Sequence, residues 1–204
     1  SGSWQMRAAQ IAETRPAWEA MATKELRAGD VGRFDLFCIV KRFDVAKAEW
    51  LRGQGKPVVY DVVDPWKQPD DGEAHSTLPE VVNFFRRMLA PMAVDGVIFP
   101  NATMQADLGE FVPCPTHIYH HHRVYQEPII VCRQATRVGY EGREDYLGPW
   151  TETATRVCQR LGLEFVVNPK SLGAIDIGLA VRGGRNGTLM AKRYKSNVKL
   201  ANLF

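Results

Sequence analysis

The alternation of short apolar runs with helical segments constrains the fold of this chain more than any other feature. In the first half, stretches rich in Val, Ile and Phe are separated by stretches whose composition suits helices. Such apolar runs are typical of strands in parallel sheets that helices cover. The sequence therefore predicts an α/β fold with a doubly wound parallel sheet. The expected strands are residues 34–41, 56–64, 95–100 and 115–122, and the expected helices are residues 45–55, 78–92 and 101–109.

Local signals mark the ends of these helices. Pro79 suits the first turn of a helix, where its missing N–H is not needed. Asn101 is an expected N-cap, and Gly53 with Gly55 is expected to end the helix of residues 45–55. These signals agree with the boundaries that the apolar pattern predicts.

The alternation breaks at residues 121–128 and then starts again. The simplest organisation is two α/β units joined near residue 125, which gives an N-terminal domain of residues 1–125 and a C-terminal domain of residues 126–204. In the second unit the expected strands are residues 129–134, 163–168 and 175–184, with a glycine-containing loop at 137–148 and helices at 149–162 and 192–204.

The composition of the chain bears on its ligands and its cellular location. Of the 204 residues, 24% are charged and the net charge is +3, which permits an anionic ligand but is below the basicity of a typical nucleic-acid-binding domain. The four cysteines form no Cys-x-x-Cys pair, which is typical of reduced thiols in the cytoplasm. No apolar run reaches the roughly 18 residues of a membrane span. We therefore expect a cytoplasmic protein without a membrane-spanning segment.

Two aspartates stand at the carboxyl end of the strand expected at residues 56–64. Ligands of open α/β sheets bind outside the carboxyl ends of the strands, and aspartate is unfavourable within a strand. Asp61 and Asp64 therefore indicate a site or a cap, although Asp64 before Pro65 also suits a turn. No third ligand at a useful spacing makes this pair a metal site.

A run of histidines ends the strand expected at residues 115–122. A His-rich run can bind a metal, although in a strand His120 and His122 point to one face and His121 to the other, so the three do not converge. One of them can instead face a cleft as a hydrogen-bond donor or general base. Ordinary surface or packing roles are the alternative.

Two segments offer hydroxyls, backbone N–H groups or cations that suit an anion. Gly2 and Ser3 precede an expected helix at residues 4–13, although a flexible terminus is an equal alternative. The second segment begins at Arg182, which is followed by two glycines that permit close approach of a ligand to the backbone.

The second segment continues into the helix expected at residues 192–204. Ser196 is an expected N-cap there, with Lys195 and Lys199 beside it, and this combination suits a phosphate. A solvated basic surface is the alternative. The sequence contains neither GxGxxG nor GxxxxGK[ST], which counts against a dinucleotide-binding or P-loop protein.

Residues 174–204 begin with AIDIGLAVRGG and end with KRYKSNVKLANLF, and they resemble the donor-binding part of the GT-B glycosyltransferases. In that family a strand of the type aDigla is followed by a helix of the type KsnvKlanal. The opening SGSWQMRAAQIA resembles the loop and helix that follow the family's first strand. DLFCIVKRFD, VVYDVVDPW and DGVIFPNATMQADLG are similar to successive units of its N-terminal domain. The Glu-x7-Glu pair of many retaining members is absent.

The resemblance implies two Rossmann-like doubly wound domains, the second of them incomplete. The family's first strand would precede Ser1, and a G-x-P turn and a further strand would follow Phe204. A nucleotide-sugar donor would be held mainly by the C-terminal domain, and an acceptor, whether a glycan, a lipid, a small molecule or a modified DNA base, mainly by the N-terminal domain. Neither a metal nor another cofactor is expected.

The resemblance also implies roles for single residues. In an inverting enzyme the base near the acceptor would be Asp61, Asp64, His120 or His122. Cations and helix N–H groups would stabilise the departing nucleoside diphosphate without a metal. The residues expected around the donor are Gly2, Ser3, Gly139, Gly142, Arg143, Arg182, Lys195, Ser196, Asn197 and Lys199.

Two other interpretations stay open at this stage. The first is an α/β protein that binds a nucleotide or a phosphorylated metabolite without transferring a sugar. The second is an inactive glycosyltransferase fragment or a structural protein.

Overall fold

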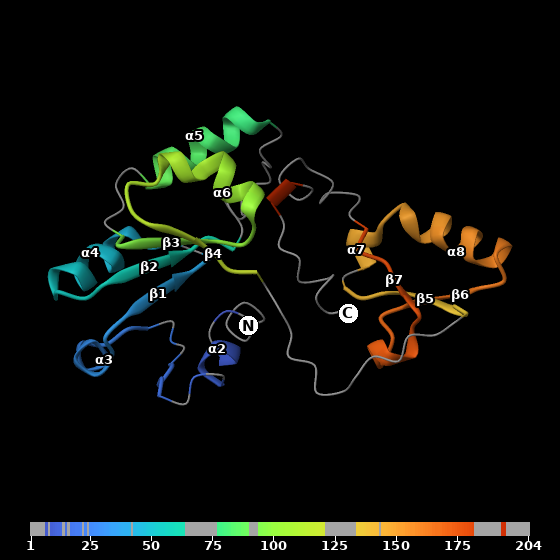
Figure 1. The fold of residues 1–204 in the computed structure, drawn as a ribbon, viewed down its shortest axis with the longest axis horizontal. Coiled ribbons are helices and arrows are strands. Elements are labelled where there is room, and N and C mark those ends of the chain that lie inside the picture. The colour runs from blue at the N-terminus through green and yellow to red at the C-terminus, as the bar shows by residue number, and fades with distance from the viewer. Residues whose placement is uncertain are drawn as a thin grey trace.

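The computed structural model shows an α/β protein with two parallel sheets (Figure 1). We refer to the sheet built from residues 37–118 as the first sheet and to the sheet built from residues 137–178 as the second sheet. The structure describes residues 7, 9–13, 15, 17–21, 23, 25–41, 43–63, 77–89, 94–120, 134–142, 144–181 and 193–194.

The strands of the first sheet lie in the order of the sequence, and each pairs in parallel with the next. They are β1 (Phe37–Val40), β2 (Val58–Asp61), β3 (Gly96–Phe99) and β4 (Thr116–Ile118). The connecting helices are α4 (Val45–Gly53), α5 (Leu78–Leu89) and α6 (Ala102–Leu108), and the 3-10 turn η2 (Gly109–Phe111) follows α6. The strands and helices predicted for this part of the chain are thus confirmed, although the strands are shorter than predicted.

The predicted helix boundaries rest on the expected local chemistry. The side chain of Asn101 accepts a hydrogen bond of 2.8 Å from the backbone N–H of Met104, which makes it the N-cap of α6. Gly55, just beyond α4, has a φ of 72°, a left-handed conformation that glycine adopts without strain. Pro79 lies in the first turn of α5, where no intrahelical N–H bond is lost.

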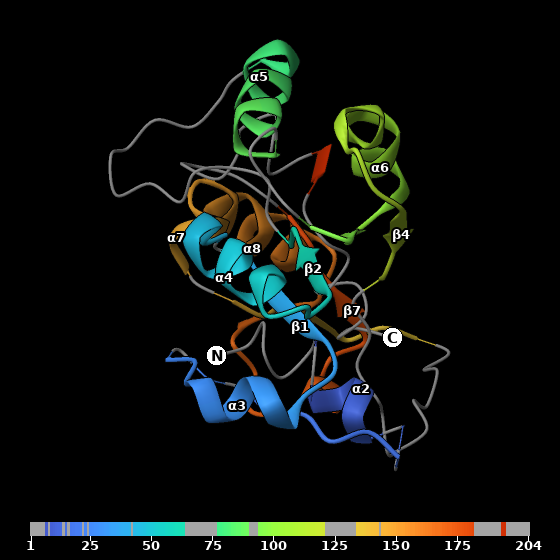
Figure 2. The same cartoon turned by 90° about the vertical axis from the view of Figure 1, so that its left-hand side faces the viewer.

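The helices α4, α5 and α6 cover one face of the first sheet (Figure 1). This follows from the strand order, because right-handed crossovers between successive neighbouring strands place every connecting helix on the same side. The helices α2 (Gln10–Glu13) and α3 (Ala28–Arg33) lie below β1 in Figure 2, and Val31 of α3 belongs to the same hydrophobic core as Ala48 and Leu51 of α4. The four described strands of this sheet contain no reversal of order, so the doubly wound arrangement predicted for it is not seen among them.

The core of the first sheet lies between its strands and the helices α5 and α6. Phe99 of β3 and Phe85 of α5 are fully buried, and their ring centroids are 6.0 Å apart. Met104 and Leu108 of α6 are also fully buried. Each such side chain stabilises the folded state by roughly 1.5–3 kcal/mol relative to exposure, so this layer fixes α6 on the sheet.

The second sheet consists of three parallel strands in the order β6-β5-β7. The order reverses at β5, which is the switch point expected in a Rossmann-like sheet. The helix α8 packs against β6. The elements are β5 (Arg137–Tyr140), α7 (Glu144–Leu147), α8 (Trp150–Arg160), β6 (Glu164–Val167), η3 (Leu172–Ala174) and β7 (Ile177–Gly178).

The prediction of a loop at residues 137–148 is wrong, because this stretch contains the central strand β5 and the short helix α7. Gly139 is the reason for the error, since glycine is unfavourable within strands and is a common loop signal. A Cβ atom at Gly139 would lie 2.5 Å from Cγ2 of Ile175. The glycine therefore permits the segment before β7 to pack closely on β5.

The predicted division of the chain near residue 125 falls in residues 121–133, outside the described residues, and stays a prediction. The same holds for most of the strand predicted at residues 129–134. The strands predicted at residues 163–168 and 175–184 are confirmed in part by β6 and β7. Among the helices that the structure describes, none has the length and apolar character needed to cross a lipid bilayer.

We expect Gly139→Ala to lower the free energy of unfolding by about 1–3 kcal/mol, the usual cost of overpacking, as measured by urea denaturation. The added methyl group would collide with Ile175. Gly53→Ala is the matched control, because no atom lies within 4 Å of its Cβ position at the end of α4, and it should leave stability unchanged or slightly higher. Ile175→Ala combined with Gly139→Ala should cost less than the sum of the single changes. A Gly139→Ala protein as stable as the wild type would contradict this account.

Candidate functional site

The carboxyl ends of β1 to β4 lie along one edge of the first sheet, which we call the carboxyl edge. Asp61 ends β2, and Asn101 follows β3 by two residues. Tyr119 and His120 follow β4, and Lys41 follows β1. The sheet thus gathers on a single edge several of the residues that the sequence pattern singled out.

A buried ion pair occupies the middle of the carboxyl edge. Nε and Nη2 of Arg7 donate to the two carboxylate oxygens of Asp61 over 2.5 and 2.6 Å. Nη1 of Arg7 donates to the backbone carbonyl oxygen of Tyr119 over 2.5 Å, and the guanidinium also lies over the Tyr119 ring. The side chains of Arg7 and Asp61 are 0% and 3% exposed. Because β3 lies between β2 and β4, Arg7 links two strand ends across a third.

Burial changes the acid–base properties of this edge. Loss of hydration raises the pKa of the Asp61 carboxyl, and the hydrogen bonds and charge of Arg7 offset part of that rise. Cys38 of β1 keeps an exposed surface, yet the protein atoms crowded around its thiol raise its pKa to about 12, with a further contribution from the Asp61 carboxylate. The Cys38 thiol is therefore protonated at neutral pH and is not an activated nucleophile.

Among the residues that the structure describes, three other than glycine adopt a left-handed backbone just after strand ends. Lys41 follows β1 with a φ of 70°, Val63 lies two residues after β2 with a φ of 50°, and Asn168 follows β6 with a φ of 52°. This conformation is most costly for a β-branched residue such as Val63. Strain of this kind is concentrated at functional sites. It therefore marks the strand ends of both sheets as candidate sites.

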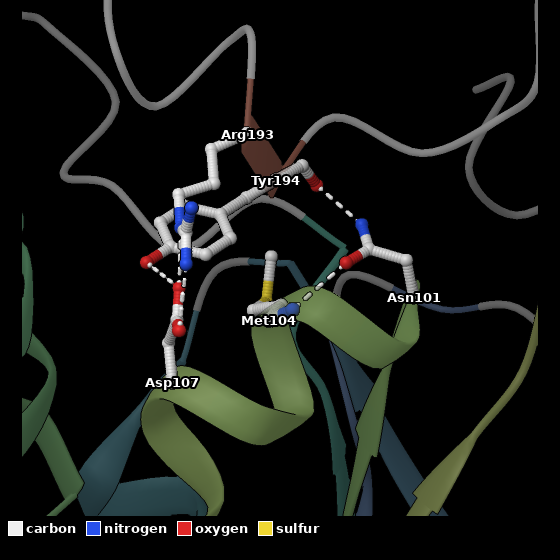
Figure 3. Close-up of polar contacts among 5 residues, drawn as sticks. All are labelled: Asn101, Met104, Asp107, Arg193 and Tyr194. Atoms are coloured by element: carbon white, nitrogen blue, oxygen red, sulfur yellow. Dashed lines mark hydrogen bonds and ion pairs between the residues drawn. The ribbon is translucent and has the colours of Figure 1, made fainter.

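A contact from the far end of the sequence reaches the carboxyl edge at α6 (Figure 3). Nδ2 of Asn101, whose Oδ1 caps α6, donates a 3.0 Å hydrogen bond to the backbone carbonyl oxygen of Tyr194. Nε and Nη2 of Arg193 donate to the carboxylate of Asp107 over 2.5 and 2.9 Å. The Tyr194 hydroxyl donates to the same carboxylate over 2.6 Å. We call these four residues the C-terminal clasp.

Tyr194 is anchored by packing as well as by polar contacts. It is 0% exposed and belongs to the same hydrophobic core as Met104, Phe85 and Phe99. Desolvation and the neighbouring Asp107 carboxylate raise the pKa of its phenol to about 12. Hydrogen bonds from Arg193 lower the pKa of Asp107. The sequence pattern did not reveal this contact, and a lone tyrosine within a basic segment was its only signal.

Two of the predicted donor residues, Gly139 and Gly142, lie within or just after β5 of the second sheet. Gly139 lies inside β5 against Ile175, so its missing side chain serves internal packing. Gly142 follows β5 and donates its N–H over 2.8 Å to the side chain of Asn168, which follows β6. Gly142 and Asn168 are thus brought together at the carboxyl ends of β5 and β6.

A polar hollow of about 420 Å³ lies at the opposite edge of the second sheet, where β5 and β6 begin. Its wall is held by Asp176, which accepts hydrogen bonds from the backbone N–H groups of Thr136 and Arg137. Arg137 in turn pairs with Glu164 over 2.6 Å. Ligands of parallel sheets bind at the carboxyl ends of the strands, so we do not place the main site in this hollow.

Several predicted site residues lie outside the described residues, and their roles stay predictions. Within the described part of the chain, no group of three or more His, Cys, Asp or Glu side chains is placed to hold a metal ion. The predicted residues outside the described ranges are Gly2, Ser3, Asp64, His122, Arg143, Arg182, Lys195, Ser196, Asn197 and Lys199.

Comparison with known proteins adds no family assignment. Neither a protein-family model nor a curated protein sequence matches this chain.

We expect Asp61→Asn to lower the free energy of unfolding by about 3–5 kcal/mol, because it leaves the charge of Arg7 buried without a partner. Urea denaturation at pH 7 measures this loss. Asp35→Asn, at an exposed aspartate, is the matched control and should change stability by less than about 0.5 kcal/mol. Arg7→Met combined with Asp61→Leu should recover most of the loss. Equal stability of Asp61→Asn and Asp35→Asn would contradict a buried ion pair.

We expect the stability that the clasp contributes to disappear at both ends of the pH scale. The pKa of Asp107 is lower in the folded protein, so its contribution is present above its ordinary value of 3.8 and is lost as the pH falls through the folded-state pKa. The pKa of Tyr194 rises from 10.0 to about 12, so its contribution is present below pH 10 and is lost as the pH rises through about 12.

The measurement compares the free energies of unfolding of the wild type and Asp107→Asn from pH 2.5 to pH 7. The difference between them should be constant above pH 5 and should shrink below pH 3.8. A difference that does not depend on pH would show that the ionised carboxylate of Asp107 is not what holds Arg193. Absorbance at 295 nm, compared with Tyr194→Phe, follows the ionisation of Tyr194 at high pH.

Proposed function

We propose that the protein is a glycosyltransferase that takes its sugar from a nucleotide-sugar donor. The hydrogen bond from Asn101 to the carbonyl oxygen of Tyr194 carries this proposal. It ties the residue just before Lys195 to the carboxyl edge, the side on which parallel α/β sheets bind ligands. Lys195, a predicted diphosphate-binding residue, thus directly follows Tyr194, whose carbonyl oxygen Asn101 holds.

The basic residues that follow Tyr194 in the sequence suit a phosphate ligand held by lysines. Transfer of the sugar leaves a nucleoside diphosphate with additional negative charge, which fixed cations stabilise. Arg7 does not supply this charge, because its guanidinium is buried and bonded to Asp61 and Tyr119. Lys195 and Lys199 follow Tyr194 in the sequence and are the proposed cations.

His120 is the proposed base that activates the acceptor. It is exposed and follows β4 on the carboxyl edge, and an imidazole accepts a proton near neutral pH. Asp61 is the weaker candidate, because both of its oxygens accept hydrogen bonds from Arg7. In this proposal the pair of Arg7 and Asp61 holds the strand ends in place, while His120 contacts the acceptor.

The engagement of Asp61 also favours a second candidate function. With this carboxylate bound to Arg7, the carboxyl edge can hold a nucleotide or a phosphorylated metabolite without an aspartate base to drive transfer. Such a binding protein would use the same cations. It would differ from a transferase in leaving the sugar–phosphate bond intact.

We expect at least one of UDP, GDP and ADP to raise the melting temperature of the protein. At 100 times its dissociation constant such a ligand adds about 2.7 kcal/mol to stability. Lys195→Ala combined with Lys199→Ala should weaken binding at least tenfold and leave the melting temperature of the free protein unchanged. Arg156→Ala with Arg160→Ala removes the same charge from exposed positions of α8 and should bind like the wild type. Failure of all three nucleoside diphosphates to shift the melting temperature of the wild type would contradict a transferase that uses a sugar donor of any of them, and a protein that binds any of these nucleotides.

Cleavage of the nucleotide sugar distinguishes the two candidate functions. A transferase should release free nucleoside diphosphate from the matching nucleotide sugar, at least slowly to water, and His120→Ala should lower that rate without weakening nucleotide binding. Tight binding with no release by the wild type in the presence of acceptor mixtures would favour the binding protein.

A further inference from the structure

The helix α8 carries a row of exposed apolar side chains. Trp150, Val157 and Leu161 are 47%, 45% and 67% exposed. Val157 and Leu161 follow Trp150 by seven and eleven residues, close to two and three turns of an α-helix, so the three lie on one side. Leu161 continues this row, because its backbone N–H bonds to the carbonyl oxygen of Val157. Ala154 lies in the same row, and we call these four residues the α8 stripe.

The α8 stripe is not the side of the helix that packs on the second sheet. Cys158 is buried and marks the packed side, where α8 contacts β6. It is turned by about a quarter of a revolution from the stripe. Figure 1 shows α8 at the outer edge of the molecule, beside the second sheet. Single exposed apolar residues are common on protein surfaces, but a continuous row of them is typical of an interaction surface.

The α8 stripe matches itself when the direction of the helix is reversed. Reversal exchanges Trp150 with Leu161 and Ala154 with Val157, so every apolar position meets an apolar position of an antiparallel copy. The small side chain of Ala154 opposite Val157 lets the two helices approach closely. Symmetric dimers use self-complementary surfaces of this kind, because both subunits contribute the same residues.

The charges of α8 favour the same antiparallel arrangement. Glu152 in the first turn is acidic, Arg160 in the last turn is basic, and both are exposed. In an antiparallel pair each Arg160 lies beside Glu152 of the other copy, and the two helix dipoles are opposed. A parallel pair would place like charges side by side. An anionic lipid surface would repel Glu152 and the exposed Glu144 of α7.

We propose that the α8 stripe is the contact surface of a symmetric dimer, in which α8 packs antiparallel against α8 of a second copy of this chain. The stripe spans only about 16 Å of helix. Because a contact of this size is smaller than a standard interface, association is weak and depends on the protein concentration. This inference is independent of the proposed function.

The test measures the dissociation constant of the dimer by sedimentation velocity of the full chain between about 5 and 500 µM, since association must follow concentration. We expect the wild type to change from monomer to dimer over this range. Trp150→Ser combined with Leu161→Ser removes both ends of the stripe at exposed positions and should weaken association at least tenfold. Trp18→Ser, at another exposed tryptophan, is the matched control and should associate like the wild type.

Exchange of the two charges gives an independent check that does not alter the stripe. Glu152→Arg and Arg160→Glu should each weaken association by about tenfold, because each brings like charges together at two symmetric places. The two changes in one chain should restore most of the association, since each pair then joins opposite charges again. Variants that had lost their fold would not show this recovery.

A wild type that stays monomeric over the whole range would overturn the inference. A dimer that is equally strong in Trp150→Ser with Leu161→Ser would also overturn it, because the copies would then meet elsewhere. Vesicles of phosphatidylcholine and phosphatidylglycerol test the other occupant. Binding of a monomeric wild type to them through Trp150 and Leu161 would assign the stripe to a membrane surface and refute the dimer. None of these results affects the nucleotide-binding test of the proposed function.

Discussion

The buried ion pair between Arg7 and Asp61 is the interaction on which the carboxyl edge of the first sheet depends. Taking two such charges out of water costs several kcal/mol for each ion, and a pair repays that cost only with good geometry and further hydrogen bonds. Here the guanidinium makes two bonds to the carboxylate and a third to the carbonyl of Tyr119. The result is a brace across the ends of β2, β3 and β4, from which the loops of the candidate site extend.

The first sheet could be predicted from the sequence because its signals are local. The apolar runs at β1 to β3, the N-cap Asn101 and the glycines at the end of α4 are each recognisable from residues within a few positions. β5 was missed for the opposite reason. Gly139 is required by Ile175, a residue 36 positions away, and a single glycine looks the same whether it serves a turn or a close packing contact.

The candidate site was only partly predictable for a similar reason. The strand-end positions of Asp61 and His120 follow from the parallel topology, but the partners of those ends do not. Arg7 meets Asp61 across 54 positions, and Tyr194 meets Asp107 across 87. No periodicity or spacing in one sequence encodes such pairs.

The sequential strand order of the first sheet also bears on how the chain assembles. Each of β2, β3 and β4 adds to the strand formed just before it, so the sheet can grow through short loop closures that cost little entropy. Arg7 is synthesised early, yet its carbonyl partner at Tyr119 exists only after β4 has joined the sheet. Among the core residues that the structure describes, Tyr194 is synthesised last. The sheet is thus the template on which the contacts of Arg7 and Tyr194 are completed.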